Sequence, residues 1–132
     1  MKTPNPVAFA DQWVKAWNAR DIEAVLSHFA DDVVFTSPTA ARLVPESGGT
    51  VHGKHALRSY WTCALEGSPD LHFELLGVYV GVETLVLHYR DQLGTMVSEV
   101  LAFRNGLVAA GHATHLRRRR SGLACGGSGK PA

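Results

Sequence analysis

The dipeptide Asn105-Gly106, which lies between two runs of strand-forming residues, constrains the fold of this chain more than any other feature. Residues 96–103 alternate between apolar and polar side chains, and residues 107–114 form a second run that suits a strand. Asn-Gly is the sequence that most strongly favours a two-residue turn between antiparallel strands. The sequence therefore predicts a β-hairpin near its C-terminal end.

The register of this hairpin predicts a pair of side chains that could carry chemistry. Closing the turn pairs Arg104 with Leu107, and the same register places Glu99 directly opposite His112. Directly opposed residues project to one face with Cβ atoms about 5 Å apart. A carboxylate and an imidazole among apolar neighbours can shift each other's pKa, as an acid–base site requires. The alternative is a solvated cross-strand ion pair.

The rest of the chain reads as helices followed by strands. Asn5 and Pro6 suit the N-cap and first residue of a helix, and Asp21 suits the N-cap of a second. Apolar residues at steps of three and four predict helices at 6–17, 22–29 and 54–65. Alternating or β-branched runs predict strands near 33–37, 71–80, 84–91, 96–104 and 107–116. Residues 38–53, rich in Pro and Gly, predict an irregular loop with a short strand near 50–52.

This order predicts the α+β class, with three helices from the N-terminal half packed over the concave face of a strongly curved, mostly antiparallel sheet. With 132 residues and 45% hydrophobic residues, the chain suits a single domain, which we expect to span 1–116. Residues 117–132 contain five Lys or Arg and no acidic residue, and we expect them to form a basic, Gly-rich flexible tail.

Composition also excludes several classes of partner and compartment. Two cysteines, Cys63 and Cys125, do not make a disulfide framework and suit a reducing compartment. No apolar leader or run of membrane-spanning length is present in the sequence. We therefore expect a cytoplasmic protein that binds neither membrane nor nucleic acid.

Three strings in the chain resemble one known superfamily. Residues 17–35, the stretch 53–61 with its Gly-then-helix pattern, and the closing run 99–108 are similar to the NTF2-like superfamily, above all to its SnoaL-like and ketosteroid-isomerase-like branches. The resemblance covers residues 5–116. It implies a cone-shaped barrel with a cavity between sheet and helices, frequent homodimers, and cofactor-independent acid–base chemistry in the enzyme members. Those include isomerases, polyketide cyclases, dehydratases and epoxide hydrolases, whereas other members only bind ligands or partners.

The resemblance transfers the catalytic positions of ketosteroid isomerases only in part. Their general-base Asp before a Pro corresponds to Ser37, and a serine hydroxyl cannot abstract a carbon-bound proton unaided. Their oxyanion-binding Tyr corresponds to Trp13, which offers only an indole N–H. Their second oxyanion donor, an Asp, corresponds to Glu99 if the turn here is one residue shorter. The resemblance thus argues against steroid isomerisation and directs Glu99 into the cavity.

His88 is a further candidate, on the neighbouring strand. If Leu93-Gly94 forms the turn, His88 lies opposite Glu99 and joins a row with His112, a set that could also hold a metal ion. We expect neither a metal nor a cofactor, because the resemblance implies cofactor-independent chemistry and the superfamily typically uses no metal. The candidate substrate-binding residues are Trp13, Trp17, Phe35, Ser37, Tyr60, Trp61, Phe73, His88 and Leu101.

These observations support two hypotheses. The first is a SnoaL-like protein that binds a small apolar organic ligand and, if it is an enzyme, acts as an isomerase, cyclase, dehydratase or hydrolase. His112 would then be the base, and Glu99 would either fix its tautomer as a carboxylate or, if kept protonated, donate a hydrogen bond to an oxyanion. The second is a non-catalytic ligand-binding or dimeric assembly module.

Overall fold

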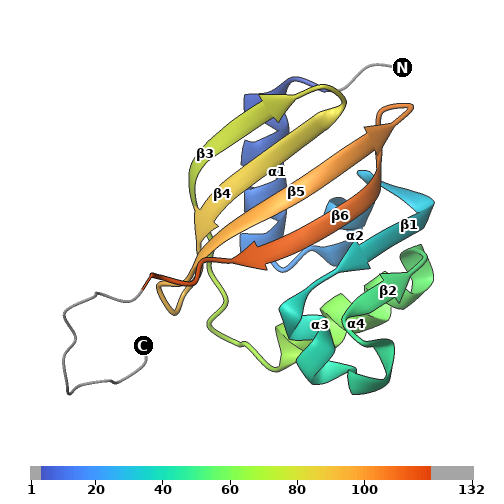
Figure 1. Ribbon diagram of the computed structural model, residues 1–132, viewed down its shortest axis with the longest axis vertical. Coiled ribbons are helices and arrows are strands. Elements are labelled where there is room, and N and C mark those ends of the chain that lie inside the picture. Colours follow the sequence, from blue (N-terminus) through green and yellow to red (C-terminus); the bar gives the residue numbers. More distant parts are fainter. Residues whose placement is uncertain (1–3, 120–132) are drawn as a thin grey trace.

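The computed structural model describes residues 4–119 and shows helices in the N-terminal half followed by a six-stranded sheet (Figure 1). The helices are α1 (Pro6–Asn18), α2 (Ile22–Leu26), α3 (Pro38–Leu43) and α4 (Lys54–Glu66), with a 3-10 turn at Pro45–Ser47. The strands are β1 (Phe29–Thr36), β2 (Thr50–His52), β3 (Glu74–Gly81), β4 (Thr84–Arg90), β5 (Met96–Arg104) and β6 (Leu107–His115). The α+β prediction is confirmed.

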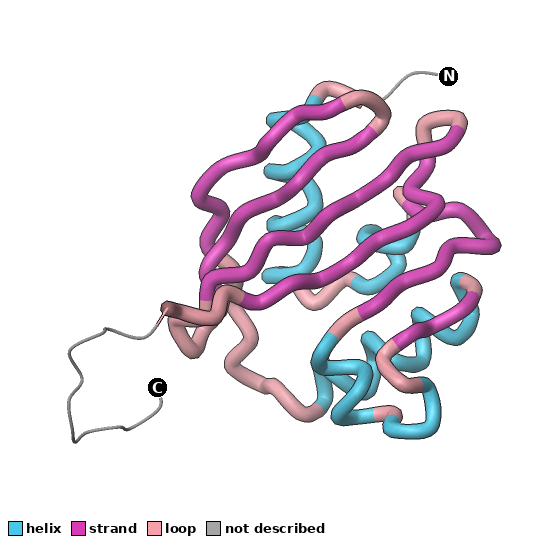
Figure 2. The backbone as a smooth tube through the Cα atoms, in the orientation of Figure 1, coloured by secondary structure: helices cyan, strands magenta, loops and turns pink. Residues whose placement is uncertain are grey.

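The sheet has the strand order β2-β1-β6-β5-β4-β3, and all of its neighbours are antiparallel except β1 and β6. Helices α1, α2 and α4 lie against one face of this sheet, behind it in the views of Figures 1 and 2. The apolar core fills the space between these two layers. Among residues 4–119, no helix has the length and apolar character that crossing a bilayer would need.

The predicted helix caps are present. The side chain of Asn5 accepts a hydrogen bond from the backbone N–H of Ala8 at 2.9 Å, and that of Asp21 accepts one from Ala24 at 3.1 Å. Each cap satisfies an N–H that lacks a partner within its helix. Helix α1 buries Phe9, among other apolar residues, on the face turned toward the sheet.

The expected loop at 38–53 is partly wrong, because it contains α3 and the 3-10 turn. Pro38 is the first residue of α3, where its fixed φ suits a helix, and the Ser37 side chain caps the helix by accepting from the N–H of Thr39 at 3.1 Å. The short strand expected near 50–52 is present as β2. Strand β1 also starts four residues earlier than predicted, at Phe29.

The predicted turn between β5 and β6 is present, with φ values of 54° and 81° at its two residues. The register changes just beyond it. Phe103 pairs with Val108, but the next pair joins Ala102 to Ala110, so Ala109 is an additional residue on β6. This β-bulge moves the remaining residues of β6 to the opposite face from the one predicted.

The predicted pairing of Glu99 with His112 is therefore wrong. Glu99 lies opposite Ala113, whereas His112 lies opposite Val100 on the other face of the sheet. There the Nδ1 atom of His112 lies 2.7 Å from the hydroxyl of Thr36, within hydrogen-bonding distance.

The predicted position of His88 is also wrong. The Asp91 carboxylate accepts hydrogen bonds from two backbone N–H groups of the β4–β5 turn, both at 2.9 Å, and Asp91 itself pairs with Thr95. Three residues, 92–94, therefore lie between the paired Asp91 and Thr95, one more than in the two-residue turn expected at 93–94. His88 consequently lies opposite Ser98, with its Nδ1 3.3 Å from the serine hydroxyl, on the face away from Glu99.

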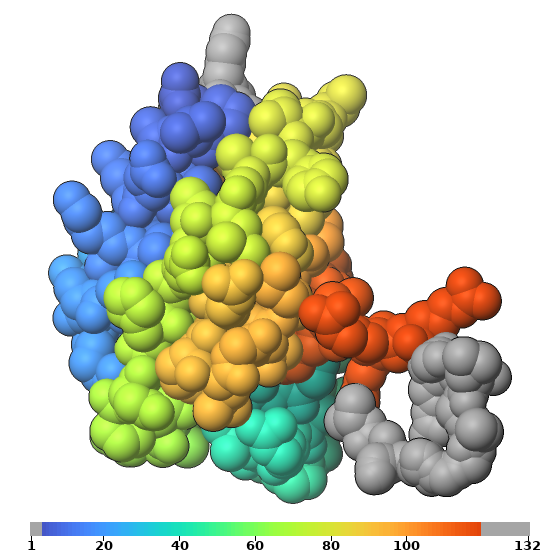
Figure 3. All heavy atoms as spheres, turned by 90° about the vertical axis from the view of Figure 1, so that its left-hand side faces the viewer, coloured from blue at the N-terminus to red at the C-terminus, as the bar shows by residue number. Residues whose placement is uncertain are grey.

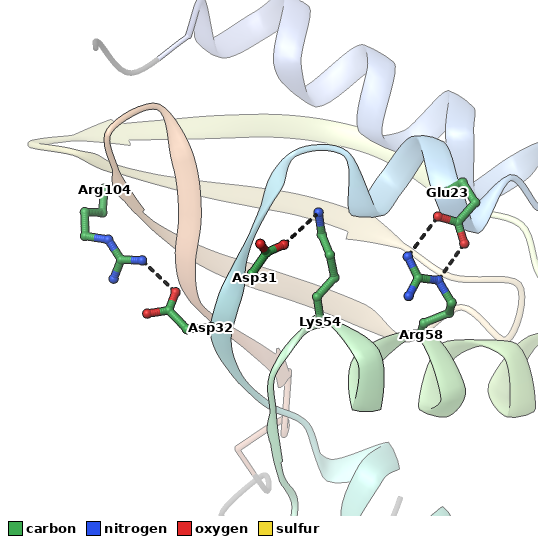
Figure 4. A network of polar contacts seen from close by, with 6 residues as sticks. All are labelled: Glu23, Asp31, Asp32, Lys54, Arg58 and Arg104. Atoms are coloured by element: carbon green, nitrogen blue, oxygen red, sulfur yellow. Dashed lines mark hydrogen bonds and ion pairs between the residues drawn. The ribbon is translucent and has the colours of Figure 1, made fainter.

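Exposed ion pairs connect neighbouring elements at the surface (Figure 4). Arg58 of α4 makes two hydrogen bonds to the carboxylate of Glu23 in α2, at 2.6 and 3.0 Å. Arg104 at the end of β5 donates to Asp32 of β1 at 2.6 Å. These pairs lower the pKa of both carboxyl groups, chiefly through the hydrogen bonds from the arginines.

Cys63 is a free, exposed thiol. Cys125 and most of the predicted tail at 117–132 lie outside the described residues.

Candidate functional site

A cavity of about 300 Å³ lies between the inner face of the sheet and the helices. In Figure 3 the gold β4–β5 turn lies between the yellow-green segment that precedes β3 and the teal segment containing α3, and all three contribute to the cavity wall. The wall is formed by Trp13, Trp17, Phe35, Ser37, Thr39, Arg42, Tyr60, Trp61, Ala64, Ser68, Leu71, Phe73, Tyr89, Asp91, Gln92, Leu93, Thr95, Val97, Glu99, Ala113 and His115.

Aromatic rings form much of this wall and hold one another in place. Trp13 stacks on Phe73 with ring centroids 6.0 Å apart, and Phe73 lies 4.3 Å from Tyr89. Trp17 meets Trp61 edge to face at 5.0 Å. Helix α1 supplies two of these rings one turn apart, so its periodicity and the core packing together position the wall.

Glu99 is the acidic residue buried in the wall. Its side chain comes from the middle of β5, and the residue is 3% exposed. Its Oε1 atom accepts a hydrogen bond from the hydroxyl of Tyr89 on the adjacent strand at 3.0 Å. Within residues 4–119 no cationic side chain forms an ion pair with it. Burial raises the pKa of Glu99 to about 7, and the hydrogen bond from Tyr89 acts in the opposite direction.

Tyr89 keeps its proton under all ordinary conditions. Burial raises the pKa of its hydroxyl well above the usual value, and the nearby charge of Glu99 raises it further. Tyr89 therefore donates to Glu99 and fixes the orientation of the carboxyl group, which leaves the second oxygen, Oε2, without a protein hydrogen bond in the described part of the chain.

A second polar group lies where β1 meets α3. The hydroxyl of Tyr60, from α4, donates to the Ser37 hydroxyl at 3.1 Å. Burial is the largest influence on Tyr60 and raises the pKa of its hydroxyl. Both residues are 6% exposed and both line the cavity. They add hydroxyl groups for recognition to the aromatic part of the wall.

Charged side chains gather toward the cavity mouth. Arg42 of α3 is exposed, and His115 at the end of β6 is partly buried. Burial lowers the pKa of His115, while the carboxylate of Asp91 raises it and the guanidinium groups of Arg42 and Arg117 lower it. The polar mouth thus contrasts with the neutral aromatic walls.

Two indole N–H groups in the wall lack hydrogen-bond partners. Trp13 is 1% exposed and Trp17 is 5% exposed. Their Nε1 atoms are the buried side-chain nitrogen or oxygen atoms within residues 4–119 that no protein group satisfies. Buried donors are normally paired, so each such group calls for an explanation.

The structure brings most of the predicted site residues together. Glu99 lines the cavity together with the predicted Trp13, Trp17, Phe35, Ser37, Tyr60, Trp61 and Phe73. Leu101 is fully buried in the core instead, and His88 and His112 lie on the opposite face of the sheet. These three residues do not line the cavity.

Sequence reasoning missed Tyr89, Arg42 and His115. A shift of one residue in the β4–β5 turn would have placed Tyr89 beside Glu99, because residues 87, 89, 97 and 99 then share a face. His115 required the bulge at Ala109, which no turn signal marks. Arg42 lies in a helix that was expected to be loop.

Two side chains at the end of α1 hold the segment that forms one edge of the cavity. The Asn18 amide donates to the carbonyl of Phe73 at 2.9 Å and accepts from its N–H at 2.8 Å, as a neighbouring strand would. The Arg20 guanidinium donates to the carbonyls of Leu65 and Ser68 at 2.6 and 2.9 Å. These bonds position Phe73 against the tryptophans of α1.

The acid, imidazole and thiol groups described in residues 4–119 do not form a cluster of three or more that could hold a metal ion. The buried polar groups that line the cavity are the carboxyl group of Glu99 and the hydroxyls of Ser37, Tyr60 and Tyr89.

Comparisons with known proteins identify relatives of this chain. The model of the SnoaL-like domain family matches residues 10–121. A SnoaL-like protein of unknown function from Burkholderia thailandensis is 36% identical, with a TM-score of 0.80, and the match covers 84% of this chain and 93% of that one.

More distant structures share the fold alone. A protein from Sinorhizobium meliloti named as a candidate polyketide cyclase is 15% identical, with a TM-score of 0.67 over 81% of this chain and 94% of that one. TerC, crystallised with polyporic acid, is 16% identical, with a TM-score of 0.68 over 84% and 92% of the two chains. None of the curated proteins matches.

Proposed function

Because the chain belongs to the SnoaL-like domain family, we propose that its cavity binds a small organic ligand and that Glu99 transfers a proton to or from that ligand. The observation that carries this proposal is the single carboxyl group buried in the aromatic wall, held by Tyr89 and by no cation within residues 4–119. Proton transfer is most efficient when the pKa of the group lies near the working pH. A pKa of about 7 meets that condition for Glu99.

The geometry assigns separate tasks to Glu99 and Tyr89. Tyr89 holds Oε1 of Glu99 at 3.0 Å, so Oε2 is the atom that can face a ligand. At neutral pH both protonation states of Glu99 are populated, so it can act as base in one step and as acid in the next. This replaces the predicted scheme in which His112 was the base, because His112 lies on the other face of the sheet.

The reaction class that fits is an isomerisation or cyclisation that moves a proton on carbon. Such a step needs one group that removes a proton and returns it elsewhere, and a hydrophobic wall that excludes water. The naming of one fold relative as a candidate polyketide cyclase, and the co-crystallisation of another with polyporic acid, support an aromatic or unsaturated ligand. We propose that no cofactor takes part.

The test is hydrogen–deuterium exchange at the acidic carbons next to the carbonyl of 2-tetralone, followed by NMR in D₂O with and without the protein. We expect the protein to accelerate exchange, and Glu99→Gln to remove the acceleration. Glu46→Gln, which alters an exposed carboxylate, is the matched control and should leave it unchanged. Acceleration that survives in Glu99→Gln would contradict the proposed role of Glu99.

A non-catalytic dimeric module is the second candidate function. One observation favours it: strand β3 is an edge of the sheet, and large apolar residues are exposed on it or just after it, namely Tyr79 (66%), Val80 (64%) and Val82 (90%). Exposed apolar patches often mark interaction sites. Sedimentation equilibrium of the wild type and of Tyr79→Glu tests this candidate, since a dimer that uses this edge should dissociate in the variant.

A further inference from the structure

One arginine at the mouth of the cavity lacks an acidic partner. Arg42 of α3 is exposed and lines the cavity, and its guanidinium group forms no ion pair or hydrogen bond with another side chain of residues 4–119. We propose that Arg42, together with the imidazole of His115, binds the carboxylate of an aromatic carboxylic acid whose rings occupy the inner part of the cavity. This inference rests on the proposed function, because it assumes that the cavity binds a ligand, and it names the class of that ligand.

The first argument compares Arg42 with the other arginines of residues 4–116. A guanidinium group presents a planar set of donors that matches the two oxygens of a carboxylate. The other four arginines in this range already use these donors. Arg20 binds backbone carbonyls, and three more bind carboxylates at 2.6 to 2.9 Å, namely Arg58, Arg90 and Arg104. Arg42 is therefore the arginine of this range that can offer its donors to a ligand.

The second argument concerns position. Thr39 and Arg42 are three residues apart on α3 and share the face that lines the cavity. Helix α3 packs against β6, which ends at His115, another residue of the cavity wall. Burial is the main influence on the pKa of His115 and on that of Tyr60, and the charge of Arg42 lowers both values. The guanidinium group thus lies within electrostatic reach of both side chains.

The third argument is the balance of charge at the mouth. Arg42 and Arg117 are permanent cations that act on His115, and Asp91 is the carboxylate that acts on it. Two cations and one anion leave a net positive charge. The Oδ1 atom of Asp91 also accepts hydrogen bonds from two backbone N–H groups of the β4–β5 turn. Because burial lowers the pKa of His115 from 6.5, its imidazole is neutral above about pH 7 and can donate a hydrogen bond to an anion.

The inner part of the cavity has the opposite preference. Glu99 is 3% exposed, and its carboxylate form would repel a second negative charge. A buried anion without a cation is also costly. The stacked rings of Trp13 and Phe73 suit a planar apolar body, and a volume of about 300 Å³ suits one or two rings. A ligand with rings at one end and a carboxylate at the other therefore fits in one orientation, with its rings toward Glu99.

The experiment compares 2-naphthoate with 2-naphthamide, which have the same rings and differ in charge. Dissociation constants are measured by calorimetric titration of the full chain at about pH 7.5. We expect the carboxylate to bind about fivefold to tenfold more tightly than the amide. In Arg42→Gln this ratio should fall toward one through weaker binding of 2-naphthoate. Arg58→Gln removes a helical arginine that does not line the cavity, and this matched control should preserve the ratio.

Salt provides a second readout that needs no variant. Because Arg42 is exposed, salt screens its attraction to an anion. An increase in NaCl from about 50 mM to about 500 mM should weaken the binding of 2-naphthoate about threefold and leave that of 2-naphthamide nearly unchanged. Arg42→Lys keeps the charge without the planar set of donors, so it should keep only part of the preference. His115→Phe should reduce the preference by a smaller factor than Arg42→Gln does.

The outcomes separate this inference from the proposed function. Equal binding of 2-naphthoate and 2-naphthamide would overturn the inference while the ligand pocket stands. A preference that survives in Arg42→Gln, or that Arg58→Gln also removes, would overturn the role given to Arg42. If neither compound binds but 2-tetralone shows exchange that depends on Glu99, the inference fails and the proposed function stands. If the carboxylate preference is present and the exchange is absent, only the role of Glu99 fails.

Discussion

At the scale of single residues, Glu99 is the group whose environment departs most from that of an ordinary side chain. The residue is 3% exposed and lines an aromatic cavity, and its carboxyl group accepts a hydrogen bond from Tyr89. Because burial disfavours the charged form, the folded protein binds the proton of Glu99 more tightly than the unfolded chain does. Ionisation of Glu99, the residue proposed to transfer a proton, therefore lowers the stability of the folded protein.

The replacement Glu99→Gln tests this linkage through stability. The pKa of Glu99 rises from 4.5 to about 7 on folding, so wild-type stability is lost as the pH rises through that range. Between about pH 5 and about pH 8, the free energy of unfolding of the wild type should fall by about 2.5 kcal/mol relative to that of the variant. Urea unfolding at several pH values measures the difference. Parallel pH profiles would contradict the assignment.

The variant-to-wild-type difference is the informative quantity, because folding also shifts the pKa of His28. His28 packs against the ring of Phe9 with centroids 4.8 Å apart, and burial lowers its pKa. Its contribution to stability is lost as the pH falls, which is the opposite direction from Glu99. Since both proteins contain His28, its effect cancels in the comparison.

At the scale of elements, the β5–β6 hairpin shows what sequence can and cannot specify. The Asn-Gly turn was predictable because both residues tolerate positive φ, which the turn requires. The bulge at Ala109 was not, because alanine carries no signal for an additional residue and β6 also has to pair with β1 on its other side. Because of the additional residue Ala109, His115 and not His112 lies on the inner face of the sheet.

Gly111 shows how tightly β6 fits against the cavity wall. A Cβ atom at this position would lie 2.9 Å from Cδ1 of Phe35 and 3.3 Å from Cδ2 of Leu101. We expect Gly111→Ala to displace the Phe35 ring, to destabilise the protein by about 1–3 kcal/mol and to weaken binding of 2-tetralone. Chemical denaturation and titration measure both effects. Unchanged stability and affinity would show that Phe35 is free to move.

Asn18 links the end of α1 to the segment before β3. Asn18→Ala removes two hydrogen bonds to the backbone of Phe73 and leaves its N–H and carbonyl without those partners. We expect a loss of about 1–3 kcal/mol in the free energy of unfolding and faster amide exchange at Phe73. Exchange followed by NMR provides the readout, with the amide of Leu85 in the core as reference. Protection at Phe73 equal to that in the wild type would contradict the role given to Asn18.

At the scale of the whole molecule, the fold was accessible from sequence because its signals are local and numerous. Helix caps at Asn5 and Asp21, apolar periodicity and alternating strands all indicate helices followed by a meander. The cavity was predictable as far as its aromatic wall, because large apolar residues on the inner faces converge there. Its polar contacts were not, since they depend on registers that differ by one residue between alternatives.

The account as a whole depends on Glu99 being a protonatable carboxyl group buried in a ligand cavity. An NMR titration of the Glu99 side-chain carbon, in the wild type and in Tyr89→Phe, tests this most directly. We expect a pKa of about 7 in the wild type. We expect a higher value in Tyr89→Phe, because the hydrogen bond from Tyr89 favours the charged carboxylate. A pKa near the ordinary value of 4.5 that does not respond to the loss of Tyr89 would contradict the account.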